Sequence, residues 1–255
     1  MTDRRKFLAR AGAGLAAFTL AGCTDLSQNK WVATILEDVE LLTRRAQRLF
    51  AGSHSLAPEF SKKDIAPEFR ANGTLNPDTA DYNTHAANGF RDWRITVDGA
   101  VEHPLSLSLA QLRAMPSRTQ ITRHDCVEGW SCIGQWKGTP LALVLAAARP
   151  REEARYVMFH CADNMAQPGS DENYYYESLD LLEATHPQTL LAYELNREAL
   201  PIQHGAPVRL RAERQLGYKM AKFIQRIDLV PEFGRIAGGK GGYWEDQGYS
   251  WYAGI

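Results

Sequence analysis

The sequence predicts an α+β domain, with mixed sheets and short helices. Strand-like runs such as "WRITVDG" at residues 93–99 begin after Phe90 and alternate apolar and polar side chains before a turn. Short helical segments such as "GTPLALVLAAA" at residues 138–148 lie among them. These strands and helices do not follow a regular β-α-β alternation, which would indicate a parallel sheet flanked by helices.

The remaining elements follow from the same two periodicities. "LSLAQLRAM" predicts a short helix that begins at Ser108, and "SLDLLEAT" predicts a helix that begins near Ser178. Four segments predict strands: "TQITRHDCV", which leads into Cys126, then "ARYVMFHCAD", "APVRLRAE" and "KFIQRIDLV". The stretch from Ser53 to Thr84 is rich in Pro, Asn, Asp and Gly, and predicts a long irregular loop of the kind that often carries function.

Size and charge exclude several classes of protein. The chain of 255 residues is 44% hydrophobic and 23% charged, which is typical of a globular protein. A formal net charge of -1 gives no indication of nucleic-acid binding, and we expect no nucleic-acid partner. No window reaches the roughly 20 apolar residues that a membrane-spanning helix needs.

The N-terminal segment, residues 1–23, is typical of an export signal. It begins "MTDRRKFLARAGAG", where a cationic start precedes a short, weakly apolar run that ends at Gly22. The Arg4-Arg5 pair followed by Phe7-Leu8 resembles the twin-arginine motif, which implies export of the folded protein to the periplasm by the twin-arginine translocase. "LAGC" at residues 20–23 also resembles a lipobox, in which Cys23 would be lipidated; ordinary cleavage near Ala21 is the alternative.

A linker and one amphipathic helix separate this signal from the main domain. Residues 24–54 begin with a polar stretch and continue with apolar residues spaced three and four apart over 31–50, which predicts a helix that Gly52 ends. This helix carries no candidate chemistry. We expect residues 55–255 to form one catalytic domain.

The stretch "RHDCVEGWS", residues 123–131, raises the question of what Cys126 does. Asp125 and Glu128 should raise the pKa of its thiol and make it a poor free nucleophile. A disulfide or a redox pair between Cys126 and Cys132 is one alternative, although the count of three cysteines after Cys23 is odd. The sequence contains no CxxC or HxxxH spacing, so it does not predict a structural zinc site.

A second informative stretch runs over residues 190–230. His204, Arg209, Lys219 and Lys222 lie close together in sequence, with glycines between them. Arginine can bind a phosphate through two hydrogen bonds, and backbone amides near glycine can bind the same anion. The alternative is a hairpin that carries these charges on its surface.

This stretch resembles the molybdenum-cofactor domain of the sulfite oxidase family, which has a tract of the form "LLAYEMNG..LP..HG.PVR" followed by a Gly and a Lys. The matching segments here are "LLAYELN" from Leu190, "LP" at residues 200–201, "HG" at residues 204–205 and "PVR" at residues 207–209, followed by Gly217 and Lys222. The resemblance implies the sulfite-oxidase-type fold and a Mo-molybdopterin cofactor. It also implies a molybdenum domain alone, without the haem and dimerisation domains of animal sulfite oxidases.

The resemblance assigns roles to individual residues. Cys126 stands where the family has its molybdenum ligand, and coordination would deprotonate the thiol despite its acidic neighbours. Tyr249, five residues after Trp244, stands where the family has a tyrosine beside the substrate. The positions that match pterin-binding or phosphate-binding residues are Asn72 in "FRANG", Asp163, His204, Arg209, Met220, Ala221 and Lys222.

Two departures from the family bear on the substrate. Sulfite oxidases hold their dianionic substrate with arginines at positions that Ala71 and Ser131 occupy here. We therefore expect oxygen-atom transfer, coupled to two-electron chemistry at molybdenum, on a small oxyanion or on an S-oxide or N-oxide. Such a substrate would enter a pocket lined by Trp130, Tyr249 and Trp251, and electrons would pass to or from a cytochrome or a membrane-bound partner. The alternatives are a sulfite dehydrogenase and a non-catalytic periplasmic binding domain.

Overall fold

The computed structural model of the chain describes residues 39, 41–49, 52, 55–166, 171 and 173–255. The chain forms two compact units that divide at Gly52. In the first unit, residues 41–49 are helical and lie within the predicted amphipathic segment. The predicted export signal over residues 1–23, including Cys23, lies outside the described residues. Within the described part, no helix is long and apolar enough to cross a membrane.

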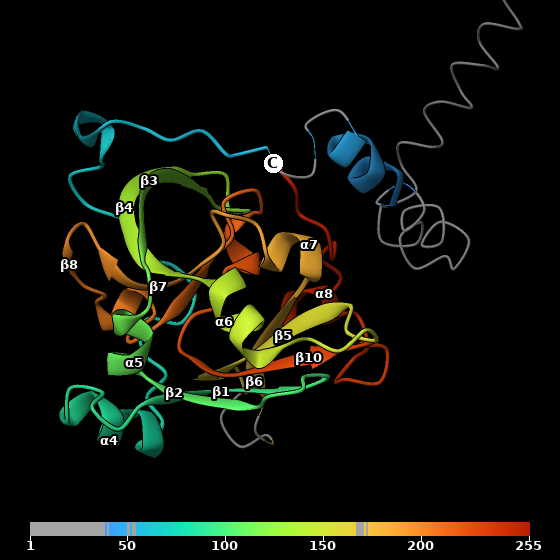
Figure 1. Cartoon of the computed structure of the whole chain (residues 1–255). Coiled ribbons are helices and arrows are strands. Elements are labelled where there is room, and N and C mark those ends of the chain that lie inside the picture. The colour runs from blue at the N-terminus through green and yellow to red at the C-terminus, as the bar shows by residue number, and fades with distance from the viewer. Residues whose placement is uncertain (1–38, 40, 50–51, 53–54, 167–170, 172) are drawn as a thin grey trace, which may run out of the picture. The chain divides into compact units, whose positions relative to one another are not determined.

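Two five-stranded sheets form the second unit (Figure 1). In the first sheet, β1 and β10 are parallel and the other neighbouring pairs are antiparallel, so the predicted mixed sheet is confirmed. Its strands are, in spatial order, β2 (Leu105–Ser108), β1 (Arg94–Gly99), β10 (Ile224–Val230), β5 (Tyr156–Asn164) and β6 (Tyr174–Asp180).

The second sheet contains the strand that leads into Cys126. It is antiparallel, and its strands are β3 (Arg118–Asp125), β4 (Ser131–Pro140), β7 (Leu190–Leu195) and β8 (Glu198–Ala199), with β9 (Arg209–Arg211) paired to β7. Strand β4 was not predicted from the sequence, because the glycines and polar residues of this segment have low strand propensity. Its side chains nevertheless alternate in burial along the strand.

The helices are short, as predicted. Ser108 caps α5 (Leu109–Ala114) by accepting a hydrogen bond from the backbone N–H of Gln111, and α6 (Leu141–Ala148) follows β4. The prediction of a helix from Ser178 was wrong in its start, since Ser178 pairs with Met158 in the first sheet and the helix begins only after the cap residue Asp180. The other helical segments are α4 (Ala80–Ala87), α7 (Leu181–Ala184), α8 (Tyr243–Asp246) and the 3-10 turns η1 (Lys62–Asp64), η2 (Ile202–His204) and η3 (Gly217–Lys219).

Helix α6 supplies much of the main hydrophobic core. Leu141, Val144 and Leu145 are fully buried, in one cluster with residues from both sheets such as Phe159 of β5 and Leu191 of β7. The helix is apolar throughout, but only one face is buried, since Leu143, Ala146 and Ala147 are exposed. The core therefore fixes the two sheets relative to each other.

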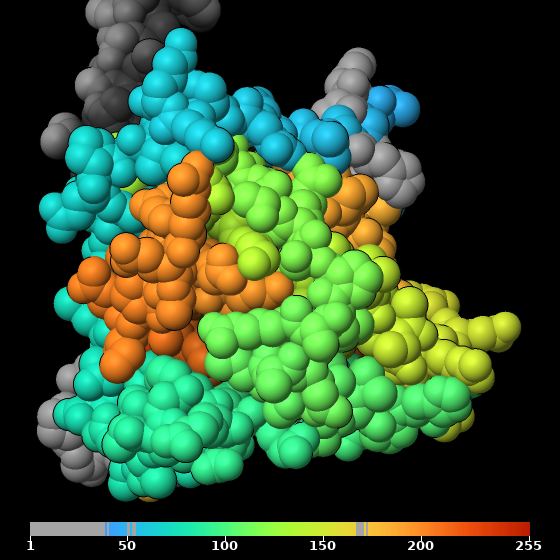
Figure 2. Space-filling model, turned by 60° about the vertical axis from the view of Figure 1, so that its left-hand side comes forward, coloured from blue at the N-terminus to red at the C-terminus, as the bar shows by residue number. Residues whose placement is uncertain are grey.

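The predicted long loop before the first sheet lies along the second sheet, as the cyan segment in Figure 2 shows. Its backbone is held there because Phe60 N–H donates to Ile121 O at 2.8 Å and Ala66 N–H donates to Ile133 O at 3.0 Å. Phe69 then packs into a smaller core cluster with Trp136. This loop thereby carries Asn72 to the end of the strand that precedes Cys126.

Gly138 is required by the close approach of two strands. The pairing of β4 with β7 shifts register between Lys137 and Gly138, and a Cβ atom added at Gly138 would lie 2.3 Å from the carbonyl oxygen of Leu191. Since that neighbour is backbone, a side chain at this position forces the strands apart.

We predict that Gly138→Ala lowers the free energy of unfolding by about 1–3 kcal/mol, because overpacking of this size typically costs that much. Urea denaturation followed by circular dichroism measures the change. Gly234→Ala is the control, since nothing lies within 4 Å of a Cβ atom there and its backbone is not left-handed. Equal effects of the two substitutions would contradict the role assigned to Gly138.

Candidate active site

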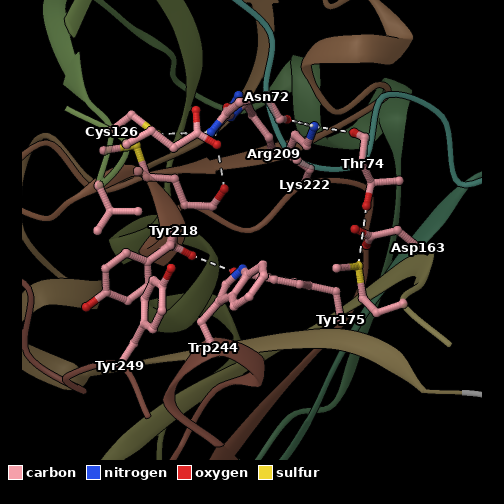
Figure 3. Close-up of a pocket in the computed structure, with 16 residues that line it drawn as sticks. Asn72, Thr74, Cys126, Asp163, Tyr175, Arg209, Tyr218, Lys222, Trp244 and Tyr249 are labelled. Carbon is pink, nitrogen blue, oxygen red and sulfur yellow. Dashed lines mark hydrogen bonds between the residues drawn. The ribbon is translucent and has the colours of Figure 1, made fainter. Parts of the chain in front are cut away.

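One pocket collects most of the residues that the resemblance singles out (Figure 3). It lies where the end of β3, the 72–74 segment and the chain around η3 meet the C-terminal segment. The predicted residues that line it are Asn72, Cys126, Asp163, Arg209, Met220, Lys222 and Tyr249. His204 and Ala221 do not line it. Both are buried behind it, where the backbone carbonyls of His204 and Ala221 accept hydrogen bonds from Arg209 Nη1 and Leu210 N–H.

Cys126 is held in a tight turn after β3. Its backbone N–H donates to Trp130 O at 2.9 Å, and its carbonyl accepts from the N–H of Gly129, whose φ of 84° favours glycine. The side chain is 7% exposed and faces the pocket. Asn72 Nδ2 donates to the thiol sulfur at 3.2 Å, so one polar group already points at the position that a thiolate would occupy.

The environment of Cys126 raises the pKa of its thiol, in the predicted direction. Burial is the largest cause, and the charge of Glu128 adds to it, whereas the Glu128 backbone N–H, Arg70 and Asn72 lower the pKa. The prediction that Asp125 contributes was wrong. Its carboxylate is engaged by Arg123 Nε at 2.9 Å and by the Ser131 hydroxyl at 2.5 Å.

Arg209 and Lys222 place two cations under one side of the pocket. Arg209 donates to the carbonyls of His204 and Met220 at 3.1 and 3.3 Å, and Lys222 Nζ donates to the carbonyls of Asn72, Thr74 and Gln203. Neither cation forms an ion pair with a carboxylate of the described residues. Burial and neighbouring positive charge lower the pKa of Arg209 to about 9 and that of Lys222 to about 7.

This positive charge also affects His204 and His124. Burial, together with the charges of Arg209 and Lys222, lowers the pKa of His204 to about 4, so its imidazole is neutral at pH 7. Burial likewise lowers the pKa of His124 well below its usual value, and its Nδ1 lies 2.9 Å from Arg211 Nη1. The alternative that these charges lie on a surface hairpin was wrong, because His204 and Arg209 are buried.

Asp163 is buried in the wall of the pocket near the end of β5, and Figure 3 shows it beside Thr74. Within the described part of the chain, nothing donates a hydrogen bond to its buried Oδ1 atom. Burial raises the pKa of this carboxyl to about 6, although Thr74 and Lys222 partly offset the effect. A buried acceptor without a donor is costly and is a position where a ligand N–H or O–H would fit.

Aromatic side chains form the opposite wall. The rings of Trp244 and Tyr249 stack at 5.3 Å, and Tyr218 packs edge-on against Tyr249 at 5.2 Å (Figure 3). Tyr249 is 39% exposed, so its phenol lies at the pocket mouth. Neither Tyr218 nor Tyr175 was predicted from the sequence as a site residue, although Tyr218 directly follows Gly217 of the matched tract.

Two of the three aromatic residues predicted to line the pocket do not line it. Trp130 Nε1 donates to Glu128 Oε2 at 2.8 Å, and Trp251 Nε1 donates to Ser178 Oγ at 2.8 Å. Glu128, a lining residue, therefore presents a carboxylate beside Cys126. Glu128 could have been identified as a site residue from its place two residues after Cys126, but from sequence it was considered only for its effect on the pKa of the thiol.

The cysteines give no indication of a redox pair. Cys126, Cys132 and Cys161 are all free, and Cys132 packs against Phe69 in the smaller core cluster rather than in the pocket. Among the described residues, no group of His, Cys, Asp and Glu has the arrangement of a metal site. By the resemblance, Cys126 would be the protein ligand of a metal in this pocket.

The residues present fit a pterin cofactor with an anionic tail. Arg209 and Lys222 supply positive charge that no carboxylate neutralises through an ion pair in the described structure, and this favours a phosphate. Asp163 offers an acceptor without a donor, which suits a nitrogen heterocycle. Cys126 supplies a soft sulfur ligand at the same pocket.

We predict that the cofactor-free protein loses stability as pH rises, in part through Asp163. Because its folded-state pKa of about 6 lies above the usual 3.8, the folded state holds a proton that the unfolded state releases. The contribution is full below about pH 4 and falls by up to about 3 kcal/mol as pH approaches 7. Asp163→Asn should remove this part of the pH dependence in urea titrations, and a variant that tracks the parent at every pH would contradict it.

Comparison with known proteins places these features in a family. A family model described as "Oxidoreductase molybdopterin binding domain" matches residues 82–233. A putative protein-methionine-sulfoxide reductase subunit, YedZ1, of Azospira oryzae is 34% identical over 251 residues, which cover 98% of this chain and 87% of that protein.

Two further relatives are protein-methionine-sulfoxide reductase catalytic subunits named MsrP. The Campylobacter jejuni protein is 36% identical, over a match that covers 56% of this chain and 50% of that protein. The Ralstonia nicotianae protein is 40% identical, over a match that covers 54% of this chain and 44% of that protein. The match therefore spans half or less of these two relatives. The sulfane dehydrogenase SoxCD from Paracoccus pantotrophus gives a TM-score of 0.49 at 23% identity, over 56% of this chain and 39% of that chain.

These matches favour an oxidoreductase over a non-catalytic binding domain, and they confirm the predicted cofactor, molybdopterin with molybdenum. The chain belongs to the family of oxidoreductase molybdopterin-binding domains, in agreement with its resemblance to the molybdenum domain of sulfite oxidases.

Proposed function

We propose that this protein reduces an organic S-oxide such as a methionine sulfoxide. In the overall reaction the S–O bond breaks, the sulfur gains two electrons, and the oxygen leaves as water with two protons. When bound, the molybdenum cofactor supplies the oxygen-atom transfer and the two-electron chemistry. The observation that carries the proposal is a pocket that combines the Cys126 sulfur with an aromatic mouth and a carboxylate, Glu128, beside the cysteine. The relatives whose names specify protein methionine sulfoxide support the same substrate class.

In this proposal Cys126 is the protein ligand of the metal, and the Asn72 amide orients its sulfur. Arg209 and Lys222 hold the anionic end of the cofactor, and Asp163 accepts a hydrogen bond from its heterocycle. His204, Met220 and Ala221 complete the site through their backbone and packing. Tyr249 at the mouth donates a hydrogen bond from its phenol to the substrate oxygen.

The charges around the pocket disfavour sulfite. Arg70 lies over the ring of Trp130, with its guanidinium 4.8 Å from the ring centre, and does not line the pocket. Ser131, where sulfite oxidases have an arginine, bonds to Asp125. Among the residues that line the pocket, the cations are Arg209 and Lys222, and both are bound to backbone carbonyls. A sulfite anion near the exposed Glu128 would also meet a like charge, which costs about 1 kcal/mol for a solvent-screened pair.

The proposal extends to location and partner. We infer that the protein is exported to the periplasm by the twin-arginine route, and that lipidation of Cys23 would hold it at the membrane. The names of its relatives include "subunit" and "catalytic subunit", which supports assembly with a second subunit. We expect that partner to be a cytochrome or a membrane-bound protein that delivers electrons.

We predict that Cys126→Ser lowers sulfoxide turnover by more than about 100-fold, because outer-shell partners of a metal already contribute about 10–100-fold and this residue would be a direct ligand. Turnover is measured with a reduced dye as electron donor, and molybdenum by elemental mass spectrometry. Cys132→Ser is the matched control and should stay active, since Cys132 packs in a core cluster. A fully active Cys126→Ser enzyme, or a matured protein without molybdenum and pterin, would refute the proposal.

We also predict that kcat/KM for methionine sulfoxide exceeds that for sulfite oxidation by more than about 5-fold, the ratio that about 1 kcal/mol of charge repulsion supports. Sulfite oxidation is followed with ferricyanide as acceptor, on the same molybdenum-loaded preparation. Efficient sulfite oxidation would instead support the sulfite dehydrogenase alternative.

A further inference from the structure

A fully buried ionic cluster lies behind the aromatic wall of the pocket. Lys219 Nζ donates to Glu177 Oε1 at 2.5 Å and to Glu245 Oε1, and the three side chains are 1%, 0% and 0% exposed. The ammonium group also lies 5.4 Å from the centre of the Trp251 ring. None of the three charged residues lines the pocket, and the proposed reaction does not use them.

Each member of the cluster is adjacent in sequence to residues that do line the pocket. Lys219 lies in η3 between Tyr218 and Met220, and Glu245 directly follows Trp244 in α8. Glu177 lies two residues after Tyr175 on β6, so that these two side chains share one face of the strand. Three segments of the chain thus present one residue to the pocket and another to the cluster.

The pocket residues next to the cluster are also bonded to one another. Tyr175 Oη donates to Tyr218 O at 2.6 Å, and Tyr249 N–H donates to Trp244 O at 3.0 Å (Figure 3). Stacking of Trp244 on Tyr249 completes the wall. The position of the Tyr249 phenol therefore depends on where α8 is attached. Glu245 bonds α8 to Lys219, and the next residue, Asp246, accepts hydrogen bonds from the Tyr176 hydroxyl and from the N–H groups of Gly238 and Lys240.

Gly242, which precedes α8, shows how closely the cluster is packed. A Cβ atom added there would lie 2.0 Å from Glu245 Oε2 and 2.8 Å from Glu177 Oε1. The two carboxylates thus lie close to each other around one glycine. Within the described part of the chain, nothing donates a hydrogen bond to Oε2 of Glu177 or to Oε2 of Glu245.

One ammonium group cannot balance two carboxylates. A net negative charge in a site without solvent is costly, and one bound proton removes it. Burial raises the pKa of Glu177 well above its usual value; the Lys219 ammonium opposes this and Glu245 adds to it, and the direction agrees with one proton held by the carboxylate pair. Each carboxylate has one Oε2 atom without a hydrogen-bond partner in the described structure, which is a position that could carry the proton.

We propose that Lys219, Glu177 and Glu245 form a charge-balanced, singly protonated cluster that positions Trp244, Tyr218 and Tyr249 against the pocket. These are positioning residues, since they act through the aromatic wall and touch neither substrate nor cofactor. The inference rests on the proposed function for the role of Tyr249, but the attachment of α8 can be measured without turnover.

The test compares Glu245→Ala with Glu245→Gln in the full-length, molybdenum-loaded protein. Glu245→Ala removes the bond between α8 and the cluster, keeps the bonds of Asp246, and leaves the balanced pair Lys219–Glu177, so the protein folds. Hydrogen exchange followed by mass spectrometry should show amides in residues 244–250 exchanging more than about 10-fold faster, with those of β3 and β4 unchanged. Glu245→Gln keeps an oxygen acceptor for Lys219 and should restore slow exchange.

Glu194→Ala is the matched control. It removes a glutamate from an exposed lysine pair, Lys137 Nζ to Glu194 Oε1 at 3.0 Å, and should leave exchange in residues 244–250 unchanged. Exchange that stays slow in Glu245→Ala, or that rises equally throughout the domain, would overturn the positioning role.

Sulfoxide kinetics on the same samples separate this inference from the proposed function. A positioning role predicts that kcat/KM falls about 10-fold in Glu245→Ala and recovers in Glu245→Gln. If exchange changes as predicted in Glu245→Ala but the parent enzyme does not turn over sulfoxide, the cluster is supported and the proposed substrate is refuted. Normal kinetics in a Glu245→Ala enzyme whose segment has become mobile would overturn the positioning role.

The bound proton has its own test. The titratable groups that face Glu177 are Lys219, Glu245, Tyr175, Tyr176 and Cys161. Because the folded state holds a proton on Glu177 that the unfolded state releases, its contribution to stability falls as pH rises above the usual glutamate pKa. The melting temperature of Glu177→Gln relative to the parent should therefore rise from about pH 5 to about pH 8. A constant difference would show that no proton is held.

Discussion

The requirement that Arg209 and Lys222 stay charged in a buried site governs the rest of the pocket. Neither has a carboxylate ion-pair partner among the described residues, and their donors reach only backbone carbonyls. Carbonyl dipoles solvate a cation but leave its net charge unbalanced. The lowered pKa values of both groups reflect this cost. An anionic group bound beside Arg209 and Lys222 would balance their charge and remove this cost, which explains why a cofactor with a phosphate is compatible with this fold.

The same lysine connects the anionic end of the site to its metal end. Lys222 Nζ holds the carbonyl of Asn72 at 2.8 Å, and the side chain of Asn72 donates to Cys126 Sγ at 3.2 Å. The loop that supplies Asn72 is in turn fixed along the second sheet by backbone bonds from Phe60 and Ala66. A change at the phosphate end can therefore reach the sulfur through only two contacts. Cofactor binding and ligand orientation are expected to be coupled for this reason.

The site combines two kinds of wall with different rigidity. Cys126 directly follows β3 and Asp163 lies near the end of β5, two long strands that are paired within sheets. Trp244 and Tyr249 instead lie in a C-terminal segment with one short helix, which Glu245 and Asp246 bond to the rest of the domain. A mouth built from such a segment can adjust to a bulky substrate, while the metal side stays fixed.

The sequence by itself determined the α+β class and five of the ten strands of the described structure (β1, β3, β5, β9 and β10), and the tract from Leu190 to Lys222 indicated the cofactor. These features are local, because strand periodicity and a matched tract are readable without knowing what packs against them. Only the tertiary structure decided that β4 is a central strand, since its glycines are explained by Phe69 and the backbone of β7. It also decided that Trp251 lies behind the pocket and that Lys219 belongs to a buried cluster, because burial and partner choice depend on residues distant in sequence.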